Sequence, residues 1–450
     1  MWCPAVNSPT SVTLPTGGGS PVPDADRTVS AVPRAATSLW RSRGTLGEFM
    51  SRRANSFGFL RLGLALAVVV SHSKPIGYGT TDPGTRWTGG QTNLGSLAVV
   101  GFFTISGFMI TGSGLHLGIG RYAWHRALRL LPGLWVCVAV TAFVVAPVLY
   151  LHQHGSTAGF WHNPDGPLQY VEGTWNTSLD KGFDISGVMR TAIRRGTNFN
   201  GSFDGALWSL SYEILCYVGV GILAVGGVLA RARRTIPLLA AGLWMLIVMN
   251  LWDAPTWRGA PRDGQATIDV PLLGHMITHY LIYLGFIFLL GAVFRLYQHR
   301  IPVNDLLALA ALIAVAGSLR YGAFYVIGYP ALTYLVIWLG VRLPRPLQAI
   351  GRTHDYSYGV YIYGFIVEQA VAMFGGTRHG RLAYLAVSVA LTLLAAAGSW
   401  HLVERPALRL RHWTPRLLRR RPPPSGSASE PATGNRPTLH GVPTGPARPV

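Results

Sequence analysis

Charged residues are scarce in this chain, and acidic residues are scarcer than basic ones. Only 12% of the 450 residues are charged, with 18 Asp and Glu against 38 Lys and Arg. A soluble globular domain carries about 25% charged residues, and the deficit here extends over most of the chain. The composition therefore argues against a soluble enzyme and favours a polytopic membrane protein.

Cysteine is nearly absent as well. Cys3, Cys137 and Cys216 offer neither a disulfide framework nor paired metal-ligand spacing. Cys137 and Cys216 lie in apolar runs, where cysteine behaves as a small core residue. His275 and His279 have helical metal-ligand spacing, but no glutamate completes a His-Glu-x-x-His motif. The sequence therefore predicts no metal site.

Both ends of the chain are poor in the long apolar runs that fill its middle. The first residues are rich in Pro, Gly, Ser and Thr and lack the apolar core of a signal peptide. The end combines a cluster of arginines with a Pro/Ser/Gly segment, a composition typical of disorder. We expect a transmembrane domain over residues 55–412 between two disordered tails, 1–54 and 413–450.

Between the tails, ten apolar runs approach the roughly 20 residues that a helix needs to cross a membrane core. They show no internal repeat. The fourth begins with the polar stretch Trp208-Ser-Leu-Ser-Tyr-Glu213, so its start is expected to be irregular. We predict an all-α, polytopic membrane bundle of about ten transmembrane helices, over residues 57–74, 94–114, 133–152, 206–229, 235–252, 273–294, 303–319, 322–341, 356–375 and 382–402.

The loops between these runs indicate the orientation. The net charge of +20 does not form one patch, as a nucleic-acid interface would require, and we expect no nucleic acid as a partner. The basic residues gather in alternate short loops and in both tails, a pattern that the positive-inside rule explains. Both termini are therefore predicted to be cytoplasmic. The loops after the second, fourth, sixth and eighth runs hold Arg121, Arg126, Arg129, Arg231, Arg233, Arg234, Arg295, Arg300, Arg342, Arg345 and Arg352.

His72 is the most unusual residue in these runs. It lies near the end of the first run, which Arg61 also interrupts. A charged side chain inside a membrane costs about 2.5–3.5 kcal/mol on insertion scales, so such residues are functional candidates. An imidazole that titrates near neutrality suits proton abstraction. In the predicted orientation His72 and Glu213 both lie near the outer ends of their spans, so we expect them to meet in the outer half of the bundle.

Six short motifs follow one another along the chain. They are Arg61 and His72 separated by ten residues, Phe102-Phe-Thr-Ile-Ser-Gly-Phe-Met109, Arg126-Ala-Leu-Arg129-Leu-Leu-Pro132, Trp208-Ser-Leu-Ser-Tyr-Glu213, Ser357-Tyr-Gly-Val-Tyr361 and Val403-Glu-Arg-Pro406. In this order, on a layout of ten spans, they resemble the acyltransferase 3 family of integral membrane O-acyltransferases. The resemblance covers about residues 55–410.

The resemblance implies transfer of an acyl group, commonly acetyl from acetyl-CoA, to a hydroxyl of a sugar, a surface glycan or a secreted metabolite. Acyl-CoA would be a co-substrate, with no tightly bound cofactor, and the location would be the bacterial cytoplasmic membrane. His72 would be a general base or an acyl relay, because an alcohol is a poor nucleophile until its proton is removed. Glu213 would orient or stabilise His72, as a carboxylate does in a triad, or pair with Arg61. The expected substrate-pocket residues are Ser106, Trp208, Ser209 and Tyr361.

Three arginines are expected to bind the acyl donor. Arg126 and Arg129 are spaced i, i+3 and so share a helix face, and guanidinium groups grip phosphates such as those of coenzyme A. Anchoring at the membrane face and lipid phosphate binding are the alternatives for this pair. Arg61 lies about 16 Å along a helix from His72, so it would bind the donor, pair with a carboxylate on another helix or extend toward the interface.

One position departs from the family pattern. Many members have a histidine after Ser-Tyr-x-x-Tyr, whereas this chain reads Tyr361-Ile-Tyr363-Gly364, which leaves a proton-relay role there without its residue. Glu404 matches the closing acidic residue of the family and is expected to order a helix end. Gly107 is expected to allow close helix packing, as small residues do in membranes.

A transporter or flippase for a lipid-linked or secreted metabolite is the alternative function. Ten spans with intramembrane Arg, Glu and His would also serve proton-coupled transport. Such transporters tend to be built from repeated halves, which the sequence does not show. The motif set therefore favours the acyltransferase.

Overall fold

The computed structural model describes residues 44–51, 55–177, 183–197, 199–252 and 266–413. Most of both expected tails lies outside these residues. The helices are α1 (Leu46–Ser51), α2 (Phe57–Tyr78), α3 (Leu94–His116), α4 (Ile119–Val140), η2 (Thr141–Val145), α5 (Ala146–His154), α6 (Pro167–Thr174), α7 (Val188–Arg194), η3 (Gly205–Leu207), α8 (Trp208–Val225), α9 (Val228–Arg231), α10 (Thr235–Trp252), α11 (Thr278–Leu296), α12 (Asp305–Tyr321), η4 (Phe324–Gly328), α13 (Tyr329–Arg342), α14 (Arg345–Ala349), α15 (Ser357–Met373), η5 (Gly376–His379), α16 (Arg381–Ser399), η6 (Trp400–Glu404), α17 (Arg405–Arg409) and η7 (Leu410–His412). Residues 46–51, which fall in the expected N-terminal tail, thus form α1, and its Leu46 is buried.

The all-α membrane architecture is confirmed, and every predicted run contains a helix. Eight helical stretches in the described chain are long and apolar enough to cross a membrane. The runs predicted at 303–319 and 356–375 correspond to α12 and α15, which have 17 residues each and are shorter than those eight. The eight long stretches are Phe57–Tyr78, Leu94–His116, Ile119–His154, Gly205–Val225, Thr235–Trp252, Thr278–Leu296, Phe324–Arg342 and Arg381–His412.

The third span begins earlier than predicted. Helix α4 starts at Ile119 and passes through Pro132, and the stretch reaches His154 by way of the π-helical turn η2. Thr141 Oγ1 donates to the carbonyl oxygen of Cys137 at 2.8 Å just where this turn begins. The predicted boundary at 133 was wrong. Arg126 and Arg129, which precede it, line a polar cavity within the protein and do not mark the end of the span.

The sixth run contains strand as well as helix. Residues Thr267–Val270 (β1) and Gly274–Ile277 (β2) form a two-stranded antiparallel hairpin in which Ile268 pairs with Met276. Helix α11 begins only at Thr278. Gly274 has a φ of +74°, a conformation that glycine adopts at little cost. The predicted start at 273 was therefore wrong, since apolar residues alone do not separate a short strand from a helix.

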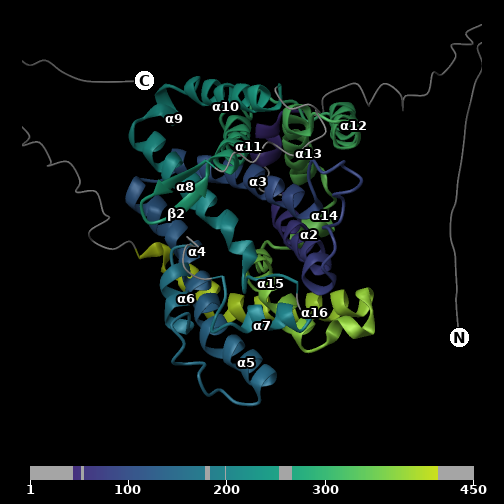
Figure 1. The fold of residues 1–450 in the computed structure, drawn as a ribbon. Coiled ribbons are helices and arrows are strands. Elements are labelled where there is room, and N and C mark those ends of the chain that lie inside the picture. The colour runs from purple at the N-terminus through teal and green to yellow at the C-terminus, as the bar shows by residue number, and fades with distance from the viewer. Residues whose placement is uncertain (1–43, 52–54, 178–182, 198, 253–265, 414–450) are drawn as a thin grey trace, which may run out of the picture.

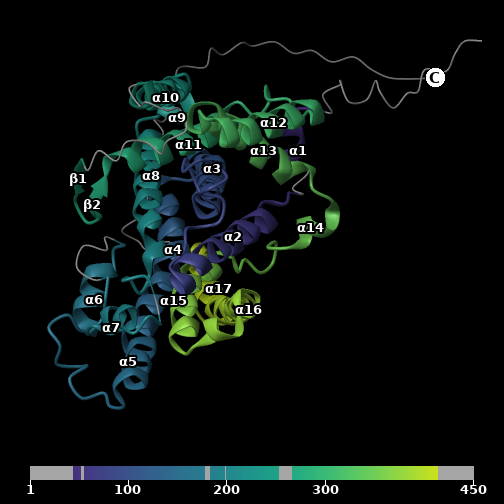
Figure 2. The ribbon, with the colours of Figure 1, turned by 45° about the vertical axis from the view of Figure 1, so that its right-hand side comes forward.

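Helix α15, which contributes to the candidate site, lies inside the bundle, below α10 and α12 in the views of Figures 1 and 2. Its residues from Ser357 to Ile366 are all buried, and it packs against α2 on one side and α16 on another. A polar side chain in this part of α15 is therefore surrounded by other protein elements.

Two glycines hold the middle of the bundle together. A Cβ atom at Gly107 of α3 would collide with the carbonyl oxygen of Phe288 on α11, and one at Gly291 of α11 would collide with the carbonyl oxygen of Thr104 on α3. The two backbones thus approach each other as closely as small residues allow. The packing role predicted for Gly107 is confirmed.

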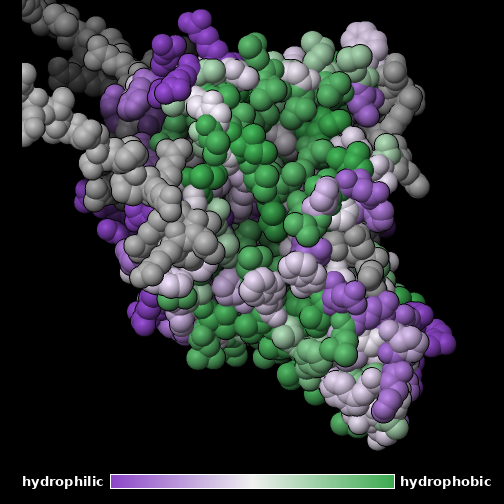
Figure 3. All heavy atoms as spheres, turned by 90° about the vertical axis from the view of Figure 1, so that its left-hand side faces the viewer, coloured by the Kyte–Doolittle hydropathy of each residue, from purple (hydrophilic) through white to green (hydrophobic). Residues whose placement is uncertain are grey.

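The outside of the bundle is suited to lipid. Figure 3 shows a broad hydrophobic face with hydrophilic residues gathered toward its edges. Large apolar side chains exposed in the structure, which a membrane would cover, include Val218, Ile222 and Val225 of α8, Leu238, Met245 and Met249 of α10, Leu309 and Ile313 of α12, and Leu382 and Leu394 of α16.

Candidate active site

A cavity of about 620 Å³ opens between α2, α3, α4, α8 and α15. The loop before α15 and the segment after η6 complete its wall. Seven arginines line it, against two carboxylates. The arginines are Arg61, Arg126, Arg129, Arg352, Arg405, Arg409 and Arg411, and the carboxylates are Glu213 and Asp355. A cavity of this size with such a surplus of positive charge suits a large anionic ligand.

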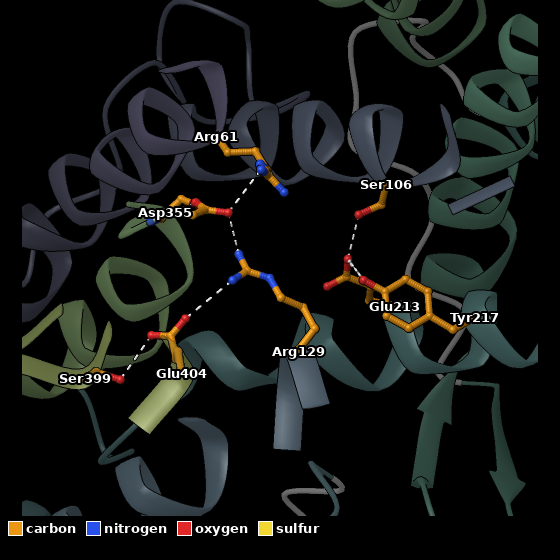
Figure 4. A network of polar contacts seen from close by, with 9 residues as sticks. Arg61, Ser106, Arg129, Glu213, Tyr217, Asp355, Ser399 and Glu404 are labelled. Atoms are coloured by element: carbon orange, nitrogen blue, oxygen red, sulfur yellow. Dashed lines mark hydrogen bonds and ion pairs between the residues drawn. The ribbon is translucent and has the colours of Figure 1, made fainter. Parts of the chain in front are cut away.

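Asp355 joins two of these arginines. Its Oδ2 lies 3.0 Å from Nη2 of Arg61 and 2.7 Å from Nη2 of Arg129 (Figure 4). Its other oxygen accepts the hydroxyl of Ser357 at 2.6 Å. Burial disfavours the charged form of Asp355, but Arg129, Arg61 and Ser357 outweigh burial and hold the pKa of this carboxyl below its usual value. Of the three roles open to Arg61, the structure shows pairing with a carboxylate on another element.

Arg129 also contacts the last span. Its Nη1 lies 3.5 Å from Oε2 of Glu404, and Glu404 Oε1 accepts the hydroxyl of Ser399 at 3.1 Å (Figure 4). The guanidinium carbon lies 5.7 Å from the ring centroid of Tyr358, which is within cation–π range. Arg129 is thus fixed on three sides, and Glu404 is buried at the π-helical end of its span.

Glu213 forms a second polar cluster on the opposite wall. Its Oε1 accepts the hydroxyls of Ser106 and Tyr217, each at 2.6 Å (Figure 4). Arg126 lies over the ring of Tyr217, with 5.9 Å from its guanidinium carbon to the centroid. Among the described residues no ion pair joins Glu213 to Arg61 or to Arg126. The carboxylate therefore keeps its second oxygen, Oε2, for the cavity.

The inner end of the cavity is closed by hydroxyl and aromatic groups. Ser209 Oγ and Tyr361 Oη lie 2.6 Å apart, and Tyr361 donates to the carbonyl oxygen of Ala206 at 2.8 Å. Phe102 packs edge-on against the Tyr361 ring at 5.6 Å. The irregular start predicted for the fourth span is confirmed, because the 3₁₀ turn η3 precedes α8 and presents this carbonyl. Trp208 instead packs on Tyr280, and it does not line the cavity.

His72 lies outside this cavity. Its ring packs edge-on against Phe365, with 5.1 Å between centroids, and it is not part of the lining. Phe365 is one helical turn beyond Tyr361 on α15, and its ring tip also lies close to Gly205. In the described chain no hydrogen bond or ion pair connects His72 with Glu213. The two residues expected to meet thus lie apart: Glu213 lines the cavity, and His72 packs against Phe365 outside it.

Gly364 marks a close approach between α15 and α2. A Cβ atom at this position would lie 2.7 Å from Cγ2 of Val69 on α2, closer than real contacts allow. Helices α2 and α15 therefore pack closely at this glycine. The side chain of Tyr363, the residue before Gly364, is buried.

Sequence reasoning missed Asp355, Tyr217 and Tyr358. A signal existed for Asp355, because it is the single acidic residue in a loop that also holds Arg342, Arg345 and Arg352. Signals existed for the two tyrosines as well. Tyr217 follows Glu213 by four residues and so shares its helix face, and Tyr358 lies within the motif Ser357-Tyr-Gly-Val-Tyr361. The pair His275 and His279 does not share a helix face as its spacing suggested, because His275 lies in β2. No group of three potential metal ligands occurs in the described part of the chain.

The chain is similar to known proteins over most of its length. The acyltransferase 3 profile, described as an acyltransferase domain, matches residues 55–404. An O-acetyl transferase of Shigella phage Sf6 is 26% identical over 360 residues, which cover 78% of this chain and 96% of the phage protein. Nodulation protein 10 of Rhizobium leguminosarum bv. viciae is 27% identical over 416 residues, or 82% of this chain and 97% of that protein. No solved structure matches the chain.

Proposed function

Since the chain belongs to the acyltransferase 3 family and is an O-acyltransferase, we propose that it transfers an acetyl group from acetyl-CoA to a sugar hydroxyl. One observation carries the choice of donor: seven arginines line one cavity that ends at a cluster of hydroxyls and a carboxylate. Coenzyme A carries a diphosphate and a 3′-phosphate at one end and its thioester at the other. Its phosphates would bind at the arginines, and its thioester would reach the polar inner end.

Arg126 and Arg129 bind the donor diphosphate in this proposal. Asp355 and Glu404 fix Arg129, while Arg126 has no carboxylate partner among the described residues and presents its charge to the ligand. A preorganised guanidinium loses little entropy on binding, so fixing Arg129 increases the affinity of the protein for the donor. Arg61 holds Asp355 in place for Arg129 and thereby acts on the donor indirectly.

The acceptor reacts at the opposite side of the Tyr361 and Phe365 layer. His72 takes the proton of the acceptor hydroxyl as its oxygen attacks the thioester carbon. The carbon–sulfur bond breaks, an ester forms, and the proton returns to the leaving thiolate to give the CoA thiol. Because Phe365 packs on His72 and Tyr361 closes the donor cavity, transfer requires the Phe365 side chain to move. A direct attack and a relay through His72 both obey this requirement.

Two features support an acceptor outside the cytoplasm. The positive-inside rule supports cytoplasmic termini and arginine-rich loops, an orientation in which the cavity mouth would face the acyl-CoA pool. His72 then lies toward the outer end of α2, where a surface sugar would arrive. We therefore place the protein in the bacterial cytoplasmic membrane, with a carbohydrate as acceptor and no metal or tightly bound cofactor.

The test uses purified full-length protein in lipid nanodiscs with radiolabelled acetyl-CoA. We expect label to appear in glycan extracted from the native host, at a rate that depends on both glycan and protein. Mass spectrometry of host glycans with and without the gene identifies the acetylated position. Absence of any acetyl difference between the two strains, together with no donor consumption in the nanodiscs, would overturn the proposal.

A further inference from the structure

The chain after the last span crosses the start of α4. Residues 405–412, which comprise α17 and η7 and are called the C-terminal strap here, are held there by two backbone contacts. Trp124 Nε1 donates to the carbonyl oxygen of Leu410 at 3.0 Å, and His125 Nε2 lies 3.2 Å from the carbonyl oxygen of Arg411. The Trp124 and Trp413 rings pack edge-on at 6.3 Å. The strap is therefore fixed at the cavity although nearly 290 residues separate it from α4 in sequence.

The strap brings its own positive charge to the cavity. Arg405, Arg409 and Arg411 are exposed, yet all three line the cavity, as does His412. Across the described residues, no carboxylate lies within ion-pair distance of these three arginines. This distinguishes them from Arg61 and Arg129, whose charges Asp355 and Glu404 offset. Deeper in the cavity, carboxylates thus offset Arg61 and Arg129 and leave Arg126 with its charge, whereas all three strap arginines keep theirs.

Helix α4 fixes the order of these charges. Trp124 and His125 hold the strap, Arg126 follows directly, and Arg129 lies three residues beyond Arg126, about 4.5 Å along the axis. Arg126 lies over the ring of Tyr217, and Tyr217 donates to Glu213, which also accepts from Ser106. A ligand that enters past the strap therefore meets unpaired arginines first, the Arg126 and Arg129 pair second, and the hydroxyl and carboxylate cluster last.

We propose that Arg405 and Arg409 of the strap bind the 3′-phosphate of the donor, so that the strap selects coenzyme A over forms that lack this phosphate. The inference rests on the proposed donor. In that order of charges the 3′-phosphate, which lies at the end of coenzyme A farthest from the thioester, reaches the strap when the diphosphate is at Arg126 and Arg129. Arginine suits this role because it binds phosphate oxygens with two parallel hydrogen bonds.

The experiment compares CoA with dephospho-CoA, which differs only by the 3′-phosphate. Full-length protein in phosphatidylcholine nanodiscs binds each compound in a calorimeter, and initial rates with acetyl-CoA and acetyl-dephospho-CoA give the two KM values. We expect wild type to favour the CoA form by about 10-fold or more, since charge-assisted contacts of this kind are worth at least that factor. In Arg405→Gln/Arg409→Gln the preference falls to about 2-fold or less, because only the affinity for the CoA form drops.

The control is Arg300→Gln. Arg300 is an exposed arginine after α11 that does not line the cavity, so its loss removes a basic loop residue of similar exposure and leaves the preference intact. Equal affinity of wild type for both compounds overturns the inference. So does an equal weakening of both compounds in the double variant, which would mean that the strap arginines bind lipid headgroups or shape the cavity as a whole.

Two outcomes separate this inference from the proposed function. Preferential binding of CoA without acetyl transfer to any host glycan supports the strap assignment and counts against the proposed acceptor. Transfer from acetyl-CoA and acetyl-dephospho-CoA at equal rates and equal KM supports the proposed donor class and overturns the strap assignment. Nanodiscs that contain phosphatidylglycerol should leave the wild-type preference unchanged if the arginines serve the donor.

Discussion

Asp355 Oδ2 lies 2.7 Å from Nη2 of Arg129, and this ion pair ties the start of α15 to α4. The same oxygen lies 3.0 Å from Arg61 of α2. The exposed fractions of the Asp355 and Arg129 side chains are 13% and 17%, so water screens the pair only weakly. Three helices thus depend on one carboxylate at the wall of the donor cavity.

The first prediction concerns Asp355→Asn. It leaves two partly buried guanidinium groups without their shared counter-charge, and breaking a buried pair from one side costs about 3–5 kcal/mol. We expect a loss of stability toward the lower end of this range, since Arg61 is about one-third exposed, and at least a tenfold rise in the KM for acetyl-CoA. Thermal unfolding in detergent and initial rates measure the two effects.

Asp165→Asn is the matched control for this substitution. Asp165 also pairs with an arginine, Arg190, at 3.0 Å, but both side chains are more than half exposed. Exposed pairs contribute about 0–1 kcal/mol, so unfolding and KM should hardly change. If both substitutions changed the unfolding temperature and the KM equally, the ion pairs of Asp355 would have no specific role in donor binding.

The pH dependence of the Asp355 pair follows from the direction of its pKa. Arg129 and Arg61 hold the pKa of the folded carboxyl below 3.8, its ordinary value, so the pair stabilises the fold at every pH above that value. The contribution is lost as pH falls through the lowered pKa, where the carboxyl becomes protonated. The difference in unfolding temperature between wild type and Asp355→Asn should therefore stay constant from about pH 5 to 8 and shrink below about pH 4. A difference that already shrinks near pH 6 would contradict this assignment.

Glu213 is predicted to act at the thioester end of the donor. Glu213→Gln keeps an oxygen that can accept from Ser106 and Tyr217 but removes the charge, so the fold should persist while kcat falls by about 10²–10⁴-fold. Tyr217→Phe removes one of the two hydrogen bonds to Glu213 and should have a smaller effect on kcat. Rates at saturating donor provide the measurement. A Glu213→Gln variant with wild-type kcat would remove the carboxylate from the chemistry.

The side chains of Phe365 and Tyr361, which lie between His72 and the donor cavity, give a further prediction. Phe365 packs on His72 while Tyr361 closes the donor cavity. His72→Gln should abolish transfer yet leave CoA affinity unchanged, since His72 does not line that cavity. Phe365→Leu should keep the fold and change the rate of transfer without changing CoA affinity. Weaker CoA binding in His72→Gln would place the imidazole in the donor site, against the geometry described here.

The sequence predicted the residues of the site better than the contacts between them. Arg61, Arg126, Arg129, Ser106, Ser209, Glu213 and Tyr361 were chosen from motifs, and all of them line one cavity. Motif spacing within a helix is set by 3.6 residues per turn, so it can be used without the fold. Asp355 stands out locally as the single acidic residue of a basic loop, but its two arginine partners depend on α2 and α4 meeting the start of α15, which the loop sequence does not encode.

The position of His72 relative to Glu213 could not be predicted from the sequence. Hydropathy and loop charge placed it and Glu213 at similar depth, but depth does not specify which helix face a side chain occupies or what stands between two residues. Phe365 on α15 decides that relationship, and Gly364 beside it shows how closely α2 and α15 pack. Such contacts depend on packing between distant segments, which residue periodicity alone does not resolve.

The close approach of α3 and α11 supports the last prediction. Gly107 faces the backbone of Phe288, and Gly291 faces the backbone of Thr104, so neither helix can yield to a larger residue without separating. Gly107→Val should therefore destabilise the fold by about 1–3 kcal/mol, the usual cost of overpacking, and should also displace Ser106, the neighbouring residue that hydrogen-bonds to Glu213. Gly242→Ala on α10 is the control: open space surrounds that position, and alanine favours helix over glycine by about 1 kcal/mol. We expect Gly107→Val to lower both the unfolding temperature and kcat, and Gly242→Ala to lower neither. A Gly107→Val protein with the wild-type unfolding temperature would contradict this prediction, because it would mean that α3 and α11 can move apart at no cost. The position of Ser106 beside Glu213 would then not depend on the contact between these helices.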